Sequence, residues 1–235
     1  MITAEGKKMS PVAFVLNVVI TALFFPALLL LLAGNWHWVE GWIFSLWMVA
    51  MIDFNLIYLY SKDPGLLTER TKAPGTGNQK SWDKYLMIFI LAIAVLWLVV
   101  LPLDAERFHL SPFFPLWLKL LGGMALVPAL YLIERSTIDN TYLSSRVRIQ
   151  SERNQHVITT GVYGFVRHPL YLGCALLMFG APLLVGSVYG LMISLIGLLV
   201  IVFRIIGEEK MMIEELEGYD EYKKKVKYRL IPLVW

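Results

Sequence analysis

The chain contains little cysteine and little charge. Its one cysteine, Cys174, excludes an internal disulfide, and no group of cysteines and histidines has the spacing of a zinc site. Charged residues make up 17% of the 235 residues, whereas 57% are hydrophobic and long apolar runs recur along the chain. This composition excludes an ordinary soluble domain and predicts a polytopic membrane protein. The net charge of +3 gives no reason to expect a nucleic-acid partner. In a membrane protein, the positions of basic residues indicate first of all which loops lie on the cytoplasmic side.

Six apolar segments each approach the ~20 residues that a helix needs to cross the hydrocarbon core. They lie at about 11–33, 41–60, 85–103, 113–133, 169–186 and 188–206. Little more than Gly186-Ser187 joins the last two, which predicts a helical hairpin. The predicted fold is therefore all-α with about six transmembrane helices. We divide this single domain into a four-helix membrane region, 1–133, and a C-terminal region, 134–235.

Basic residues gather in two of the loops between these segments. The first loop holds Lys62, Arg70, Lys72, Lys80 and Lys84, and the second holds Arg135, Arg146, Arg148, Arg153 and Arg167. In the opposite loops, near 35–40 and 104–111, Arg107 is the only lysine or arginine. The positive-inside rule therefore places both termini and both basic loops in the cytoplasm. Turn chemistry in 64–79 indicates a loop, and helical spacing of apolar residues in 208–227 predicts a helical extension of the sixth span.

The run Gly161–Gly173 places Arg167, His168 and Pro169 at the start of the fifth apolar segment. Proline favours the first position of a helix and pushes the preceding residue out of helical geometry, so we expect a helix to begin at Pro169. Arg167 and His168 would lie at its positive end and suit an anionic or hydrogen-bonding ligand. The alternative is a basic anchor at the lipid headgroups.

Arg204 lies near the end of the sixth apolar segment, and Glu208 follows four residues later on the same helical face. One interpretation is a helix-stabilising ion pair worth a few tenths of a kcal/mol. The other is that Arg204 faces a cavity, because an arginine in an apolar run is costly to bury and suits a carboxylate or phosphate.

Asp53 is the ionisable residue deepest in a predicted span. Such a residue is a functional candidate by default. We interpret it as structural, protonated or hydrogen-bonded to Asn17 or Asn55, since no basic residue in a span is an obvious counter-ion. Cys174 is interpreted as a packing residue rather than a nucleophile.

The C-terminal third resembles the isoprenylcysteine carboxyl methyltransferase family, in its bacterial and archaeal integral membrane form. The motifs that occur in the family's order are Gln150, Gln155–Ile158, Gly161–Gly173, Arg204 with Glu208-Glu209, and Glu221-Tyr222 ahead of Pro232. The Arg-His-Pro-x-Tyr core is shared with phospholipid methyltransferases and membrane reductases. The pair Arg204 and Glu208 narrows the resemblance to a methyltransferase.

The resemblance implies a cytoplasmic S-adenosylmethionine pocket in a catalytic region, 134–235, with S-adenosylhomocysteine as the product. The residues that would hold the cofactor are Gln150, Gln155, His156, Val157, Ile158, Tyr163, His168, Pro169, Leu170, Tyr171 and Glu208. Arg204 would hold the carboxylate of a lipophilic acceptor in the bilayer, such as an isoprenylcysteine-like or prenylated molecule.

Two other functions remain open from the sequence. In a phospholipid or amine N-methyltransferase, Arg204 would contact a phosphate and a base would remove the amine proton. In a transporter or scaffold without a cofactor, Asp53 and Arg204 would belong to a transmembrane ion pathway. The sequence assigns no oligomeric state.

Overall fold

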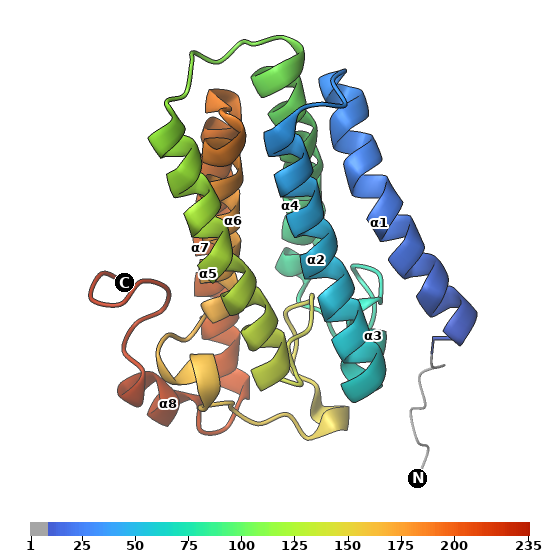
Figure 1. Ribbon diagram of the computed structural model, residues 1–235. Coiled ribbons are helices and arrows are strands. Elements are labelled where there is room, and N and C mark those ends of the chain that lie inside the picture. The colour runs from blue at the N-terminus through green and yellow to red at the C-terminus, as the bar shows by residue number, and fades with distance from the viewer. Residues whose placement is uncertain (1–8) are drawn as a thin grey trace.

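The structure is a computed structural model that describes residues 9–235. Its helices are α1 (Pro11–Ala33), α2 (Val39–Lys62), α3 (Pro64–Arg70), α4 (Ser81–Pro102), α5 (Leu116–Asp139), α6 (Pro169–Val185), α7 (Val188–Glu215) and α8 (Tyr219–Lys225) (Figure 1). A π-helix, Leu103–Arg107, extends α4, and two 3-10 turns occupy Ser151–Arg153 and Gly161–Gly164. No strand forms within 9–235, so the all-α prediction is confirmed.

Five helices are long and apolar enough to cross a bilayer, namely α1, α2, α4 with its π extension, α5 and α7. The sixth predicted span, α6, has 17 residues and falls short of the usual crossing length. Gly186, with a φ of 86°, ends α6, and the Ser187 side chain caps α7, which confirms the predicted hairpin. Pro169 occupies the first turn of α6, also as predicted.

The short helix α6 is held against α5 through glycines. A Cβ atom on Gly122 of α5 would lie 2.4 Å from the backbone nitrogen of Leu184, and one on Gly173 would lie 3.1 Å from the Ala129 carbonyl oxygen. Small residues let membrane helices approach this closely, and van der Waals packing then holds them together. The contact fixes the end of α6 at which Pro169 and its neighbours lie.

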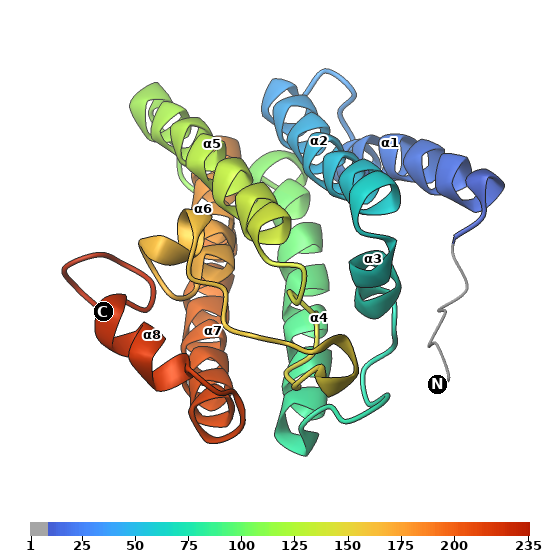
Figure 2. The ribbon, with the colours of Figure 1, turned by 90° about the horizontal axis from the view of Figure 1, so that it is seen from below.

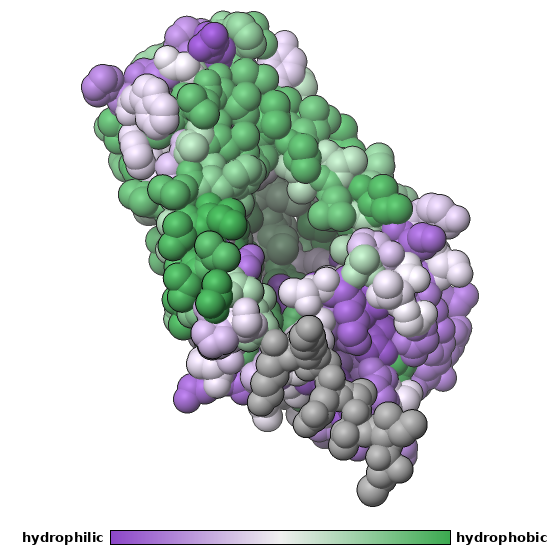
Figure 3. Space-filling model, turned by 90° about the vertical axis from the view of Figure 1, so that its right-hand side faces the viewer, coloured by the Kyte–Doolittle hydropathy of each residue, from purple (hydrophilic) through white to green (hydrophobic). Residues whose placement is uncertain are grey.

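The outer surface of the bundle is apolar over its middle. Large hydrophobic side chains are exposed on α1, α2, α4, α5 and α7, and Figure 3 shows hydrophobic residues across one face with hydrophilic residues at both ends. Inside, a core that includes Leu29, Phe44, Trp97 and Leu126 joins five of the helices. Together with the apolar helices, this surface identifies an integral membrane protein.

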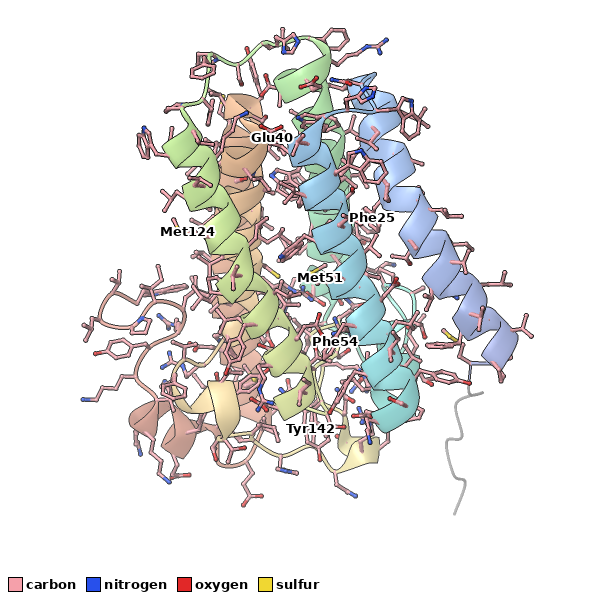
Figure 4. The ribbon with its side chains drawn as sticks, viewed as in Figure 1. Phe25, Glu40, Met51, Phe54, Met124 and Tyr142 are labelled. Atoms are coloured by element: carbon pink, nitrogen blue, oxygen red, sulfur yellow. The ribbon has the colours of Figure 1, made fainter. Side chains whose placement is uncertain are left out.

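The two ends of the bundle differ in the length of their loops. The upper end in Figure 4 carries Glu40, which accepts a hydrogen bond from Lys119 Nζ at 2.6 Å, and the short connections lie there. Tyr142 marks the lower end, where 63–80, 140–168 and the C-terminal segment gather (Figures 1 and 4). Both loops that were predicted to be basic are therefore on one side. The prediction that the N-terminus is cytoplasmic concerns residues 1–8, which lie outside the part of the chain that the structure describes.

The lower end is built from more structure than the sequence predicted. The first basic loop contains α3, which begins where the Asp63 side chain accepts a hydrogen bond from the Leu66 backbone N–H at 2.9 Å. As predicted, α7 continues past Glu208 and α8 follows it. Seen from this end, α4 and α7 lie side by side, with α3 against α2 and α8 against α7 (Figure 2).

Candidate active site

A cavity of about 570 Å³ extends from the lower loops into the bundle. Its apolar part is lined by Phe25 of α1, Met48 of α2 and residues of α4 such as Val95 and Trp97. Figure 3 shows a hollow with hydrophobic residues around it and hydrophilic residues below it. Ligand pockets of this size are usual, so the cavity has room for a small molecule and part of an apolar chain.

Ten of the eleven predicted cofactor residues and Arg204 line this one cavity. They are Gln155, His156, Val157, Ile158, Tyr163, His168, Pro169, Leu170, Tyr171 and Glu208. These residues come from the 140–168 segment, α6 and α7, which the chain brings together from positions up to 53 residues apart, counted from Gln155 to Glu208. The lining also includes several residues between 25 and 98. Both the predicted membrane region, 1–133, and the predicted C-terminal region, 134–235, therefore contribute to the cavity.

Gln150 is absent from the lining of the cavity, and the cofactor contact predicted for it stays a prediction. Its side chain is fully buried. The Gln150 amide nitrogen donates to the Tyr142 carbonyl at 2.7 Å, and its Oε1 accepts from Arg153 at 2.8 Å. Its backbone N–H donates to Gln155 Oε1 at 2.7 Å. Gln150 therefore shapes the loop that carries Gln155, through hydrogen bonds of both its side chain and its backbone.

Helices α6 and α7 present three polar side chains to the cavity. The Tyr171 hydroxyl donates to Glu208 Oε2 at 2.8 Å, and the guanidinium carbon of Arg204 lies 6.0 Å from the Tyr171 ring centroid. One turn separates Arg204 from Glu208 on α7. The arrangement offers a carboxylate, an aromatic face and a guanidinium within one wall.

Arg204 pairs with Asp83, a residue that the sequence did not indicate. Arg204 Nε donates to Asp83 Oδ1 at 3.0 Å, and Nη2 donates to the Ser145 carbonyl at 2.6 Å. The fully buried Asp83 also accepts from the Val147 backbone N–H at 2.8 Å and from the Gln79 amide at 2.7 Å. The interpretation of Arg204 and Glu208 as a helix ion pair is therefore wrong, and Arg204 does face a cavity.

Arg167 and His168 are occupied by the protein's own carboxylate. Glu209 Oε1 accepts from Arg167 Nε at 2.6 Å and lies 3.3 Å from His168 Nε2, while its Oε2 accepts from Arg229 Nε at 2.7 Å. Arg167 Nη1 also donates to the Val226 and Lys227 carbonyls, both at 2.7 Å. The prediction of a headgroup anchor is wrong, because both side chains are buried. Both residues border the cavity, and their contact with an anionic or hydrogen-bonding ligand stays a prediction.

Two tyrosines join the far wall of the cavity. The Tyr222 hydroxyl donates to the Tyr163 carbonyl at 2.7 Å, and the Tyr163 hydroxyl donates to the Ser136 carbonyl at 3.3 Å. Burial raises the pKa of Tyr163, so its hydroxyl stays neutral. Tyr219 also lines the cavity, and its buried hydroxyl has no hydrogen-bond partner among the described residues. A buried polar atom of this kind is suited to a ligand.

The predicted partners of Asp53 are bound elsewhere. The Asn55 amide donates to Glu134 Oε2 and Thr137 Oγ1, each at 3.1 Å, and Asn17 donates to the Ala13 carbonyl at 2.7 Å. Asp53 Oδ1 has no partner in the described part of the chain, so the predicted hydrogen bond to Asn17 or Asn55 is wrong, and the structural role of Asp53 stays a prediction. Cys174 borders the cavity, and its role as a packing residue stays a prediction.

Glu69 of α3 clamps the two basic loops together. It accepts from Arg146 Nη2 at 2.5 Å, Arg148 Nε at 2.8 Å and Lys72 Nζ at 2.9 Å. Burial alone would raise the pKa of Glu69, but hydrogen bonds from Arg148 and Lys72 and the charges of both arginines lower it to about 2. The segment that holds Ser145 and Val147 is thereby fixed over the cavity.

We expect this clamp to weaken in acid. The pKa of Glu69 is below its ordinary 4.5, so the interaction stabilises the fold fully above pH 4.5 and is lost as the pH falls toward 2. At neutral pH, Glu69→Gln should lower the thermal unfolding midpoint by roughly 4 °C or more. That difference should shrink below pH 4.5, whereas Glu214→Gln on the exposed surface should show no such change. A constant difference across this range would contradict the clamp.

The comparisons with known proteins agree with this geometry. Residues 118–217 match the model of a family described as phospholipid methyltransferase, and this segment includes Arg204, Glu208 and the run 161–173. The fold is similar to a solved structure of the eukaryotic intramembrane Ras methyltransferase ICMT (isoprenylcysteine carboxyl methyltransferase). The identity is 18% and the TM-score 0.50, over 96% of this chain and 88% of that chain. No curated protein matches the chain significantly.

The chain is an integral membrane methyltransferase, because apolar helices and the matched family segment occur in one bundle. Within this class it has the ICMT type of fold, and the resemblance of its C-terminal motifs is confirmed. Methyltransferases of this kind generally use S-adenosylmethionine.

Proposed function

We propose that the protein transfers a methyl group from S-adenosylmethionine to the carboxylate of a lipophilic acceptor, such as an isoprenylcysteine-like molecule. The observation that carries this proposal is the continuity of the cavity. Its polar end holds Tyr171, Arg204 and Glu208, and its apolar end reaches Phe25 and Trp97 between the spanning helices. One ligand with a charged head and an apolar chain would match both ends.

The residues at the polar end fit the cofactor. Glu208 has one oxygen bound by Tyr171, which leaves the other to accept from an amino group. The unpartnered Tyr219 hydroxyl and the His156 ring offer further hydrogen bonds, and apolar Val157 and Ile158 would cover a flat ring. The cofactor positions 155–158, 163, 168–171 and 208 are part of this proposal, with His168 held in place by Glu209.

Methyl transfer to a carboxylate depends more on how the two reactants are positioned than on acid–base catalysis. When bound, the cofactor supplies an electrophilic methyl group on a sulfonium. A carboxylate acceptor is already deprotonated at neutral pH, so the protein needs no general base for it. Arg204, held by Asp83 and Ser145, would orient the acceptor with its Nη1, which makes no hydrogen bond to the described residues. The Tyr171 ring would face positive charge.

The sidedness of the bundle supports a cytoplasmic site. Both basic loops and the polar end of the cavity lie at one end, and the positive-inside rule assigns such loops to the cytoplasm (Figure 1). In this proposal the acceptor resides in the bilayer and the cofactor enters from the cytoplasm.

The phospholipid family match favours a second candidate, methylation of an amine headgroup. An amine acceptor must lose a proton, and Glu208 is the carboxylate in the cavity wall that could take it. Methylation assays with a prenylcysteine acid and with an aminophospholipid distinguish the two, because the product is an ester in one case and an amine in the other.

Calorimetric titration of S-adenosylhomocysteine into the detergent-purified protein tests the proposed cofactor site. We expect saturable binding, weakened at least about tenfold by Glu208→Ala, since a hydrogen bond to a charged group contributes about 1.5–3 kcal/mol. Glu214→Ala, an exposed glutamate on the same helix, is the matched control and should bind as the wild type does. No binding to the folded wild type would refute the proposal, and equal affinity of Glu208→Ala would remove Glu208 from the site.

A further inference from the structure

Arg70, the last residue of α3, brings a guanidinium to the cavity from the first basic loop, in addition to those of Arg167 and Arg204. Its Nη1 donates to Thr137 Oγ1 of α5 at 3.0 Å. Its Nε and Nη2 make no hydrogen bond to the described residues, and no carboxylate of 9–235 lies within ion-pair distance of it. Arg70 therefore has donors to spare on the cavity side of α5.

Two buried arginines that line the same cavity are already neutralised, whereas Arg70 is half-buried. Arg204 pairs with Asp83, and Arg167 pairs with Glu209. A guanidinium that already has a carboxylate partner adds little net attraction for an anion, whereas one without a partner adds its full charge. Arg70 is thus the better source of positive charge for an anionic ligand in this cavity.

The groups that face Arg70 leave its charge poorly compensated. Glu134 of α5 is the acid that acts on it at longer range, but its Oε2 is bound by Asn55, whose amide also contacts Thr137 Oγ1. Tyr163 and Cys174 are its other titratable neighbours. Burial lowers the pKa of Arg70, which shows that its surroundings disfavour the charged form. An arriving anion would relieve this cost.

We propose that Arg70 binds a carboxylate within the cavity. The carboxylate belongs to the lipophilic acceptor or to the aminoacyl end of the cofactor, and the inference rests on the proposed function. The planar guanidinium with free Nε and Nη2 matches the two oxygens of a carboxylate in bidentate fashion. Where the carboxylate is that of the acceptor, Arg204 supplies a hydrogen bond to it and Arg70 supplies the net charge.

Four probes separate the two sources of the carboxylate. They are an N-acetyl S-prenylcysteine, its neutral carboxamide, S-adenosylhomocysteine, and methylthioadenosine, which lacks the aminoacyl end. Binding of each is measured calorimetrically to the wild type, Arg70→Gln, Arg70→Lys and Lys62→Gln. Lys62 is an exposed cation at the end of α2, outside the cavity, and serves as the matched control.

If Arg70 holds the acceptor, Arg70→Gln should bind the prenylcysteine acid at least about tenfold more weakly and the carboxamide unchanged. If it holds the cofactor, S-adenosylhomocysteine should weaken to the same extent and methylthioadenosine should not. In either case Arg70→Lys should recover part of the affinity, because it keeps the charge and loses the fork.

Equal binding of all four probes to Arg70→Gln and the wild type would overturn the inference. The inference would also fail if Arg70→Gln weakened the acid and its carboxamide equally, and S-adenosylhomocysteine and methylthioadenosine equally. That pattern would indicate a structural role for Arg70. A wild type that binds neither adenosyl compound would refute the proposed function, while the acid and carboxamide would still test Arg70.

Discussion

Glu209→Ala is expected to lower the free energy of unfolding by roughly 3–5 kcal/mol and to abolish binding of S-adenosylhomocysteine. Glu209 is 2% exposed and is the shared partner of Arg167, His168 and Arg229. Removing it leaves buried positive charge without a carboxylate, and that costs far more than the loss of an exposed ion pair.

The effect should spread because Glu209 holds Arg167, and Arg167 holds the tail. Arg167 Nη1 binds two carbonyls at 226 and 227, and the backbone N–H groups of Arg167 and His168 donate to the Tyr228 and Arg229 carbonyls at 3.0 and 2.9 Å. If this junction between α6 and the tail opens, α8 loses its support. Tyr219 and Tyr222 of α8 line the cavity, so the cofactor wall would open with it.

Chemical unfolding in detergent, followed by circular dichroism, measures the loss of stability, and calorimetry measures the loss of binding. Glu217→Ala, in the exposed turn between α7 and α8, is the control and should change neither. The stability and the affinity of Glu209→Gln should fall between those of the wild type and Glu209→Ala, because an amide keeps one acceptor oxygen and loses the charge. Wild-type stability in Glu209→Ala would show that Arg167, His168 and Arg229 do not depend on the Glu209 carboxylate.

Local signals predicted the parts of this structure that depend on neighbours in the chain. Pro169 starts α6 because proline suits a first helical turn, and the length of the apolar runs predicts five of the long helices, although α6 is shorter than its run suggested. The Asp63-Pro64 pair is an equally local start signal for α3, with a capping carboxylate before a proline. The turn residues that follow it in 64–79 favoured a loop instead.

The ion pairs of the site could not be predicted in the same way. Asp83 and Arg204 are 121 residues apart, and Arg167 and Glu209 are 42 apart. No periodicity links residues across such distances, because their contact depends on how α4, α6 and α7 pack. The face of α7 was predicted correctly for Arg204 and Glu208, whereas Glu209, turned away from that face, proved to be the partner of the Arg-His pair.

Asp83→Ala should be the most damaging change on α4, with a loss of roughly 3–5 kcal/mol in the free energy of unfolding. The Arg204 guanidinium would remain buried without its carboxylate, and the Val147 backbone N–H would lose its acceptor. The segment 144–150 would then be held by Glu69 and by the contacts of Asn78 and the Lys80 backbone. We expect weaker binding of the acceptor as well, because Arg204 would no longer be fixed in one orientation.

A double-mutant cycle shows whether the charge pair itself causes the loss. Arg204→Met alone should be destabilising, since it leaves Asp83 buried and without its guanidinium, but Asp83→Ala combined with Arg204→Met removes both charges. The double variant should therefore unfold at higher denaturant than Asp83→Ala, although it should not turn over a carboxylate acceptor. If the two single losses simply add, Asp83 and Arg204 are not coupled, and the stability of this wall comes from the Val147 and Gln79 contacts of Asp83 instead.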